Sequence, residues 1–528
     1  YSPGVAEPCK SIAKRKSDVY KYTAKSNLVA VITNGSAVLG LGNIGPEAAK
    51  PVMEGKGLLF KIYADIDVFD IELDVENTDE FVQTVKSIAP TFGGINLEDI
   101  KAPECFEIER RLVKELSIPV MHDDQHGTAI ISGAALLNAL ELVNKKIDKV
   151  KVVVNGAGAA AISCLKLYIR LGVKRQNIIL CDSKGVIRKD RSEISKEKKK
   201  FASNRRVHTL SDAIKKSDVL IGLSVGNTVT QKMLKTMNKN PIVFAMANPD
   251  PEISYLDAKK ARKDIIIATG RSDFPNQVNN VLGFPYIFRG ALDVRASKIN
   301  ESMKVAAVRA IAALAKEVVP EDVNLAYHGK NLSFGPDYII PKPNDPRLIT
   351  RVSIAVAKAA IKSGVAKKEI TDWDKYEEIL IDRLGLDNRL IRSFNRTAKE
   401  NKKRVLFIEA DNYNILKAAE ILHIDDLCIP ILLGNKKFIY NLSQENGIDL
   451  SGIEIIDVKD EEWRLKRHDF ADVYWKMHER NGVTKNQARR RMRDRAYFGS
   501  MMLLHNEADV FLSGVARSYP EALRPPLE

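Results

Sequence analysis

The sequence has few cysteines and no cysteine motif. Its five cysteines, scattered from Cys9 to Cys428, form no CxxC pair and no zinc-like spacing. An odd, scattered set is typical of reduced thiols, so we expect a cytoplasmic protein rather than a disulfide-stapled secreted one. No run of about 18 apolar residues occurs, so we expect no membrane-spanning helix. No secretory signal peptide is visible in a chain whose first residue is Tyr1 rather than methionine.

The two most basic stretches contain few aromatic residues. The formal net charge is +14, and lysine and arginine are densest in residues 184–206 and 485–495. A surface that binds single-stranded nucleic acid interleaves such charges with aromatic side chains, and neither stretch does so. We interpret both as solvated faces of a lysine-rich protein and expect no nucleic-acid partner.

A chain of 528 residues has room for about three domains. Residues 1–126 mix short apolar runs with loops rich in glycine and proline. Periodicity there predicts strands at residues 29–32 and 58–62 and a helix at residues 78–88. We expect these residues to form an α/β domain of their own.

From residue 127 onward, predicted strands and helices alternate, which indicates a parallel, doubly wound sheet. Helices are predicted at residues 129–143 and 159–171, and strands at residues 150–154, 177–181, 219–223, 242–245 and 265–268. Residues 299–366 are predicted to be mostly helical. A charged stretch then precedes new strands at residues 404–409 and 429–433. We therefore expect a second domain at residues 127–394 and a third at residues 395–528.

A glycine-rich turn follows the strand predicted at residues 150–154. Gly156, Gly158 and Ala161 fit the pattern G-x-G-x-x-A, and a predicted helix begins at Ala159. The first glycine permits a tight turn, the second lets the backbone approach a pyrophosphate, and the helix N–H groups receive the phosphate charge. With Asp182 ending the next strand, this context predicts a dinucleotide site. The alternative is a strand–helix turn that binds nothing.

Asp182 would accept a hydrogen bond from the ribose 2′-hydroxyl, which favours NAD. However, Ser183 and Lys184 follow it, and residues 196–200 contain four lysines. Lysines near that ribose could hold a 2′-phosphate instead. We therefore favour NADP and leave NAD open.

Two adjacent acidic pairs indicate a site for a hard cation. Asp123-Asp124 follow a β-like run, and Glu98-Asp99 lie upstream. Such oxygen ligands suit Mg²⁺ or Mn²⁺. Adjacent residues of a regular helix diverge by about 100°, so Glu98 and Asp99 can converge only at a helix start or in a loop. The alternative is an N-cap with solvated carboxylates.

His122 and His126 have the i,i+4 spacing of a zinc helix, which would suggest a hydrolase. The residue after His122 is Asp rather than the expected Glu, and Gly127 follows His126 at once. We therefore do not favour zinc.

Lys56 lies between two glycines ahead of the apolar run 58–62. Near a divalent cation its pKa would fall from about 10.4, which would allow a neutral general base. Asn248 and Asn280 each follow a predicted strand, at the end of the sheet where cofactor and substrate should meet. A solvated lysine and loop-capping asparagines are the alternatives.

These residues belong to motifs that resemble the malic enzyme family. The motifs occur in family order from Tyr1 to about Ala366: YSPGVAEPC, GLGNIG, PVMEGK, NLEDIKAPECFEIE, HDDQHGTA, NGAGAAA, FAMANPDPE and NNVLGFPYIFRGALD. The tail resembles phosphate acetyltransferase through RVLFIEADNYNILKAAEIL, MRDRAYFGSMM and SGVARSYPEALRPPLE. The combination is similar to large bacterial malic enzymes that have such a C-terminal domain.

The resemblance implies an α/β protein with a malic-enzyme N-terminal domain, a Rossmann-type doubly wound domain and a partial phosphate acetyltransferase-like domain. It implies oxidative decarboxylation of (S)-malate to pyruvate and CO₂, with NADP or NAD and Mg²⁺ or Mn²⁺. DSKG at Asp182 resembles the NADP-using branch. One departure is Ala37, where eukaryotic members have an arginine for malate.

The family's functional residues map onto this sequence as follows. The metal ligands correspond to Glu98, Asp99 and Asp124, the general base to Lys56 with Asp123 beside it, and the general acid to Tyr1. The cofactor and substrate site corresponds to Gly156, Ala157, Gly158, Ala159, Ala160, Asp182, Ser183, Lys184, Asn248 and Asn280.

For the C-terminal domain we expect a regulatory and oligomerising role, with acetyl-CoA as effector and a homo-oligomer as the assembly. The alternative is a second, acetyltransferase activity, for which Arg524 matches a phosphate- or CoA-contacting arginine of that family. A nucleotide-sensing scaffold without activity would leave Lys56 and the acidic pairs unexplained.

Overall fold

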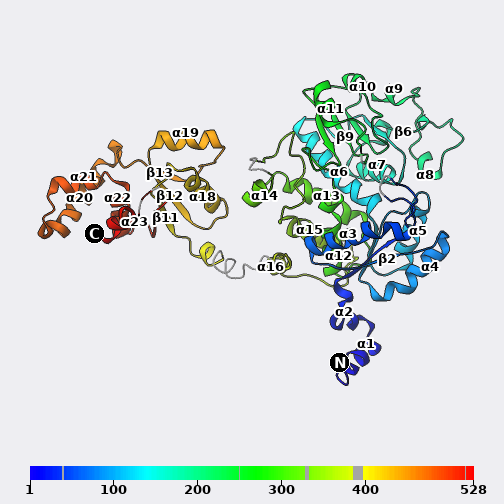
Figure 1. Ribbon diagram of the computed structural model, residues 1–528, viewed down its shortest axis with the longest axis horizontal. Coiled ribbons are helices and arrows are strands. Elements are labelled where there is room, and N and C mark those ends of the chain that lie inside the picture. The colour runs from blue at the N-terminus through cyan, green and yellow to red at the C-terminus, as the bar shows by residue number, and fades with distance from the viewer. Residues whose placement is uncertain (39–40, 249, 328–331, 385–395, 516, 518) are drawn as a thin grey trace. The chain divides into compact units, whose positions relative to one another are not determined.

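The computed structural model describes residues 1–38, 41–248, 250–327, 332–384, 396–515, 517 and 519–528. The chain forms two compact units, Tyr1–Leu386 and Asp387–Glu528 (Figure 1). Gly40 of the GLGNIG motif and the boundary predicted at residue 395 lie outside the described residues.

The first sheet of unit Tyr1–Leu386 is parallel, with strand order β2-β1-β3-β4. Its strands are β1 (Leu28–Thr33), β2 (Asp67–Glu72), β3 (Gly94–Leu97) and β4 (Val120–His122). The strand predicted at residues 29–32 is therefore confirmed. Leu97 pairs with His122, so the acidic pairs that follow these two residues leave the same edge of the sheet. Ligands of α/β proteins usually bind at that carboxyl edge.

The strand predicted at residues 58–62 is wrong, because these residues lie in helix α3 (Pro46–Ala64). Pro46 suits the first turn of a helix. Met53, Phe60 and Ala64 recur at helical spacing and are fully buried, whereas Leu58 and Ile62 are 59% and 55% exposed. The apolar run is thus divided between two faces of a helix. Lys56 consequently projects from a helix and not from a glycine loop.

The second sheet confirms the doubly wound prediction. Its order is β10-β9-β8-β5-β6-β7, and all neighbours are parallel except β6 and β7. The strand order reverses between β5 and β8, which creates a crevice at their carboxyl ends. The strands are β5 (Val152–Asn155), β6 (Ile178–Asp182), β7 (Gly185–Val186), β8 (Val219–Gly222), β9 (Ile242–Ala245) and β10 (Ile266–Thr269).

Helices cover both sheets, and one of the apolar clusters contains residues of both. α4 (Thr78–Ile88) and α7 (Ala159–Leu171) have the predicted bounds, whereas α6 (Asp123–Leu142) begins at Asp123, ahead of the prediction. A single buried cluster includes Val29 of β1, Phe60 of α3 and Val154 of β5. The other long helices are α1 (Ala6–Lys14), α5 (Glu104–Glu115), α12 (Phe284–Asp293), α13 (Glu301–Leu314), α15 (Leu348–Lys362) and α16 (Trp373–Arg383).

Unit Asp387–Glu528 contains a parallel sheet of order β13-β12-β11-β14. Its strands are β11 (Arg404–Phe407), β12 (Ile429–Leu433), β13 (Glu454–Ile456) and β14 (Val510–Leu512). Separate apolar clusters cover the two faces of this sheet. The helices are α18 (Tyr413–Ile424), α19 (Lys436–Asn446), α20 (Arg464–His478), α21 (Lys485–Arg491), α22 (Arg495–Leu504) and α23 (Tyr519–Leu527).

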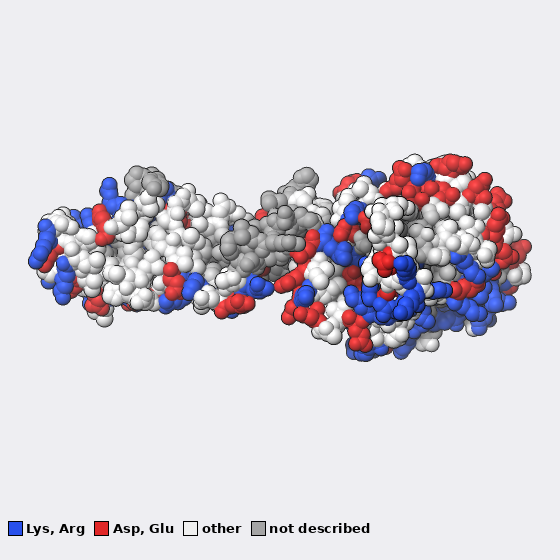
Figure 2. All heavy atoms as spheres, turned by 90° about the horizontal axis from the view of Figure 1, so that it is seen from below, with Lys and Arg blue, Asp and Glu red and all other residues white. Residues whose placement is uncertain are grey.

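The surface mixes charges of both signs. Figure 2 shows acidic side chains among the basic ones on the visible face, and basic side chains are denser along the lower edge of the larger unit. Among the described residues, no helix has both the length and the apolar character that crossing a membrane requires.

Candidate functional site

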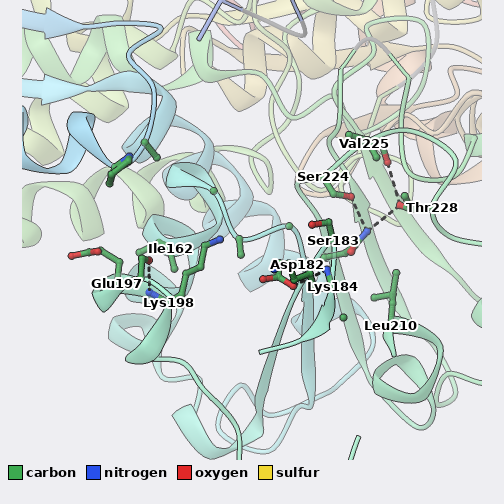
Figure 3. A pocket seen from close by; sticks show the side chains of 18 of the residues that line it. Ile162, Asp182, Ser183, Lys184, Glu197, Lys198, Leu210, Ser224, Val225 and Thr228 are labelled. Atoms are coloured by element: carbon green, nitrogen blue, oxygen red, sulfur yellow. Dashed lines mark hydrogen bonds between the residues drawn. The ribbon is translucent and has the colours of Figure 1, made fainter. Parts of the chain in front are cut away.

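A cavity of about 860 Å³ opens at the crevice of the second sheet. Its lining includes Gly156, Ala157, Gly158, Asp182, Ser183 and Lys184. Figure 3 shows Asp182 and Ser183 on one wall and Ser224 and Thr228 on the adjoining one. The six predicted residues are therefore brought together. The lining among the described residues does not include Ala159 and Ala160, which begin α7, or Asn248 and Asn280.

The glycine-rich turn has the conformation that its residues suggested. Gly156 has φ +112°, and a Cβ there would lie 2.1 Å from the carbonyl oxygen of Leu223, so only glycine fits. Asn155 donates to Ser224 Oγ (2.7 Å) and Thr228 Oγ1 (3.0 Å), which joins β5 to the loop after β8. Gly158 precedes α7, whose N-terminus therefore faces the cavity with the partial positive charge that phosphate groups require.

Asp182 does not present a bare carboxylate to the cavity. Arg191 donates from Nη1 to Oδ1 (2.9 Å) and from Nη2 to Oδ2 (2.8 Å), and the backbone N–H of Lys184 donates to Oδ1 (3.0 Å). Burial would raise the pKa of Asp182, but these hydrogen bonds outweigh it and hold the pKa below its usual value.

Three carboxylates converge at the carboxyl edge of the first sheet. Oxygen atoms of Glu98, Asp99 and Asp124 lie within 4.8 Å of one another, although 25 residues separate Asp99 from Asp124. Asp99 takes a left-handed φ of +53° in the loop after β3, and its N–H donates to Asp124 Oδ2 (2.8 Å). This irregular turn is what lets two adjacent acidic residues face one point. Burial, together with the charges of the neighbouring carboxylates, raises the pKa of Glu98 well above its usual value despite Lys56.

Lys56 projects from α3 into this cluster. Its ammonium lies 2.8 Å from Glu98 Oε1 and 2.7 Å from Asp123 Oδ2, and 4.3 Å from the ring centre of Phe284. Burial would lower the pKa of Lys56, but the two carboxylates outweigh it, so the pKa is raised. In the absence of another cation, Lys56 is therefore held in its charged form.

Asn280 completes the surroundings of Asp123. Its amide donates to Asp123 Oδ2 (3.3 Å) and accepts from Thr128 Oγ1 (3.1 Å). Asp123 Oδ1 is buried and has no hydrogen-bond partner among the described residues. A buried carboxylate oxygen of this kind can accept a further hydrogen bond or coordinate a cation.

A buried polar group holds α5 against the start of α6. Glu109 Oε1 accepts from the backbone N–H of His122 (3.0 Å) and lies 2.9 Å from His126 Nε2, while Lys304 Nζ lies 3.1 Å from Nδ1 of the same ring. Burial and the charge of Lys304 lower the pKa of His126, against the opposing charge of Glu109. His126 is thus engaged outside the carboxylate cluster, whereas the i,i+4 pattern had offered it as a zinc ligand.

Two of the predicted site residues, Tyr1 and Asn248, lie apart from the carboxylate cluster. Tyr1 is 104% exposed, and Figure 1 shows it at the end of an arm that projects from its unit. Asn248 is exposed in the loop after β9 and adjoins Gly270, where an added Cβ would lie 2.9 Å from its Oδ1.

Sequence reasoning missed Glu109 and Arg191. Glu109 follows Cys105 and Ile108 on the buried stripe of α5, and a carboxylate on an apolar stripe is a signal that could have identified it. Arg191 lies in a loop after β7, and no sequence pattern singles it out.

The second unit has a cavity of its own, of about 360 Å³, lined by residues that include Arg517 and Arg524. Arg517 also pairs with Asp494 at 3.1 Å. The arginine that the sequence singled out therefore lies in a cavity with a second arginine.

Comparison with known proteins identifies the family. Residues 1–113 match the family model "Malic enzyme, N-terminal domain", and residues 125–326 match "Malic enzyme, NAD binding domain". A "Probable NADP-dependent malic enzyme" of Rickettsia prowazekii is 50% identical over 99% of this chain and 68% of its own length. The chain belongs to the malic enzyme family. Residues 389–528 match "Phosphate acetyl/butaryl transferase".

Both cofactor types occur among similar malic enzymes. The Escherichia coli "NADP-dependent malic enzyme" is 49% identical over 99% of this chain and 69% of its own length. An "NAD-dependent malic enzyme" of Rhizobium meliloti is 47% identical over 99% and 68%. Among solved structures, malic enzyme from Pyrococcus horikoshii has a TM-score of 0.65 and 43% identity, covering 75% of this chain and 90% of its own.

Proposed function

We propose that this protein catalyses the oxidative decarboxylation of (S)-malate to pyruvate and CO₂, with NADP⁺ as the favoured hydride acceptor and a divalent cation. The observation that supports this most is the adjacency of two sites. Glu98 and Asp99 belong to the carboxylate cluster. Ala102, Pro103 and Phe106 of the same segment line the cavity proposed for the nucleotide. A reaction that combines metal-assisted decarboxylation with hydride transfer to a nicotinamide requires a metal site next to a nucleotide site.

The donor set fits Mg²⁺ or Mn²⁺. Glu98, Asp99 and Asp124 offer only hard oxygen ligands. The raised pKa of Glu98, caused by burial and by the surrounding carboxylates, indicates repulsion that a cation would offset. When bound, the cation supplies Lewis-acid polarisation of malate oxygens, and the nicotinamide supplies the acceptor for the C2 hydride.

Lys56 is our candidate for the base that takes the proton of the C2 hydroxyl. Lys56 must first lose a proton, because its ion pairs with Glu98 and Asp123 stabilise the charged ammonium form. A cation bound by the carboxylates would offset their negative charge and thereby lower the pKa of Lys56. Asp123 and Asn280 then orient the lysine. After CO₂ leaves, C3 requires a proton, and we assign its donation to Tyr1.

Tyr1 can act in this way only if its arm reaches a carboxylate cluster. Its exposure leaves it available either to fold back or to approach the site of a second copy. We accordingly propose a homo-oligomer, with the arm as one candidate contact. Asn248, beside Gly270, remains our candidate for the cofactor and substrate site, together with Ala159 and Ala160 at the start of α7.

For residues 395–528 we propose a regulatory and oligomerising role with acetyl-CoA as effector. The cavity is lined by Arg517 and Arg524 together with Asp494 and Glu521, and its guanidinium groups are the donors that would contact a CoA phosphate. The same cavity supports the alternative, an acetyltransferase activity. Residues 1–126 and 127–394 would form the substrate and nucleotide domains. We place the protein in the cytoplasm on the basis of its five unpaired cysteines.

The test is the absorbance of reduced nicotinamide when the protein meets (S)-malate and Mn²⁺, with NADP⁺ and NAD⁺ in separate reactions. We expect reduction that is stoichiometric with pyruvate and faster with NADP⁺. Lys56→Arg keeps the charge but not the base, and should lower kcat by about a hundredfold or more. A folded, metal-loaded protein that reduces neither nucleotide would refute the proposal. Acetyl phosphate formed from acetyl-CoA and phosphate would favour the second activity.

A further inference from the structure

A buried carboxylate supports one wall of the nucleotide cavity. Glu252 follows β9 in the motif FAMANPDPE and is only 1% exposed. Its Oε1 accepts from the backbone N–H (2.7 Å) and from the hydroxyl (3.2 Å) of Ser224, and its Oε2 accepts from the backbone N–H of Ala247 (3.1 Å). Burial raises the pKa of Glu252, and these hydrogen bonds oppose the rise. Glu252 therefore joins the loop after β8 to the loop after β9.

The end of β8 leaves room for this carboxylate. A Cβ at Gly222 would lie 2.3 Å from Glu252 Cδ, so a larger residue there would displace the side chain. The backbones of the two loops are also paired, because the N–H of Asn227 donates to Pro251 (3.1 Å) and the N–H of Val229 donates to the carbonyl oxygen of Glu252 (3.0 Å). The two loops are thus held together as one support.

The carboxylate also determines how the cavity wall presents its hydroxyl groups. Ser224 and Thr228 line the cavity, whereas Glu252 is not part of its described lining (Figure 3). An ionised carboxylate only accepts hydrogen bonds. The hydroxyl proton of Ser224 is therefore directed to Glu252, and its oxygen accepts from Asn155 Nδ2 (2.7 Å). Asn155 also donates to Thr228 Oγ1 (3.0 Å), which itself donates to the carbonyl oxygen of Val225 (3.2 Å). Both hydroxyl protons are engaged within the wall, so the two oxygens can only accept from a ligand.

We propose that Glu252 is a positioning residue of the nucleotide site, which fixes the loop after β8 and makes the hydroxyl groups of Ser224 and Thr228 hydrogen-bond acceptors. Such a wall suits the donor groups of a dinucleotide, which are its ribose hydroxyls and its carboxamide. Phosphate groups only accept and gain nothing from this wall. The inference rests on the proposed function of the cavity as the dinucleotide site.

The test is Glu252→Gln, assayed in the full chain with (S)-malate and Mn²⁺. An amide has a single accepting oxygen, so the N–H of Ser224 or of Ala247 would face an NH₂ group that cannot accept. The KM and the calorimetric Kd for NADP⁺ should rise by about tenfold, and kcat should change less than KM. Loss of folded protein would lower kcat and leave KM unchanged, and that result would overturn the proposal.

Hydrogen–deuterium exchange locates the effect in the chain. Peptides that cover residues 223–229 should exchange faster in Glu252→Gln than in wild type, whereas peptides that cover residues 94–99 should not change. Ser224→Ala is a milder variant in case Glu252→Gln does not fold. It retains the backbone N–H but removes the hydroxyl that Glu252 and Asn155 share, and the KM for NADP⁺ should rise by about threefold. A wild-type KM in either folded variant would overturn the proposal.

The matched control is Glu420→Gln. Glu420 is also buried (5% exposed) and accepts from a backbone N–H, that of Asp449 (2.6 Å), but it belongs to the second unit and does not line the described part of the cavity. Its KM for NADP⁺ should match wild type, and a rise equal to that of Glu252→Gln would overturn the proposal. If wild-type protein does not bind NADP⁺, the proposed function fails. If wild type and Glu252→Gln bind it equally well, only this inference fails.

Discussion

Gly127 faces the carboxylate of Asp123 across one turn of α6. A Cβ at Gly127 would lie 2.2 Å from Asp123 Oδ1 and 2.8 Å from Asn280 Cγ. The absence of a side chain therefore leaves room for the two groups that orient Lys56. The sequence shows this glycine only as a residue after His126, since its role depends on Asn280, which is 153 positions further along the chain.

Gly127→Ala should accordingly reduce malate oxidation by about a hundredfold, because a displaced Asp123 no longer orients the lysine. The measurement is kcat, with circular dichroism to verify folding. Gly55→Ala is the matched control, since a Cβ at this second helical glycine would meet nothing within 4 Å. That change should preserve activity and stabilise α3 by about 0.5–1 kcal/mol. Equal kcat in both variants would contradict the prediction.

Asp124 provides a direct test of the metal assignment. Asp124→Asn keeps an oxygen that can accept from the N–H of Asp99 but removes one of three negative charges. We expect Mn²⁺ affinity to fall by about tenfold or more, measured by the paramagnetic resonance signal of free Mn²⁺. Asp74→Asn, at an exposed position, is the control. Unchanged Mn²⁺ affinity in Asp124→Asn would remove Asp124 from the ligand set.

At the scale of secondary-structure elements, the site depends on how α5 is held against α6. Glu109 of α5 accepts from the backbone N–H of His122 and contacts His126. Its segment follows Glu98 and Asp99, while α6 contains Asp124. The contact therefore helps to fix the distance between Glu98 and Asp99, which follow β3, and Asp124, which follows β4.

This contact should make stability depend on pH. Burial would raise the pKa of Glu109, but His126 and Lys304 outweigh it and lower the pKa to about 2. A carboxyl group with a lowered folded-state pKa stabilises the fold above its unfolded value of about 4.3. That stabilisation is lost as the pH falls toward 2.

The urea midpoint of wild type should therefore fall between pH 6 and pH 3 more steeply than that of Glu109→Gln, whose amide does not titrate. Glu107→Gln, on the exposed face of the same helix, should match the wild-type slope. Parallel slopes for Glu109→Gln and wild type would show that Glu109 contributes no such pH dependence.

At the scale of the whole molecule, the two units have separate apolar cores. Phe288 belongs to the cluster that unites both sheets of the first unit, and Phe498 to a cluster of the second. Each of these two clusters is formed by residues of its own unit, so the two units can unfold in separate steps. The nucleotide cavity lies wholly within the first unit.

Calorimetric melting of the full chain should therefore show two transitions. NADP⁺ at about 100 times its Kd should stabilise one of them by about 2.7 kcal/mol and leave the other in place. Phe498→Ala should lower only the transition that NADP⁺ does not shift. A single transition, or one in which NADP⁺ and Phe498→Ala act on the same step, would contradict independent unfolding.

The sequence alone determined the doubly wound sheet, the glycine turn at Gly156 and the acidic pairs, because each of these features depends on residues that are close together in the chain. Strand periodicity and a turn that only glycine can make are local properties of the chain. Family motifs added Lys56 and the ligand set as expectations. The error at residues 58–62 arose because a short apolar run has no unique period until the faces that bury it are known.

Only the tertiary structure decided which of these groups meet. Glu98, Asp124 and Lys56 come from three segments, and the parallel register of β3 and β4 and the packing of α3 bring them within a few ångströms. The pairing of Arg191 with Asp182 depends likewise on the fold of a loop with no sequence signal. Distances between remote segments are set by sheet register and helix packing, and local sequence does not encode them.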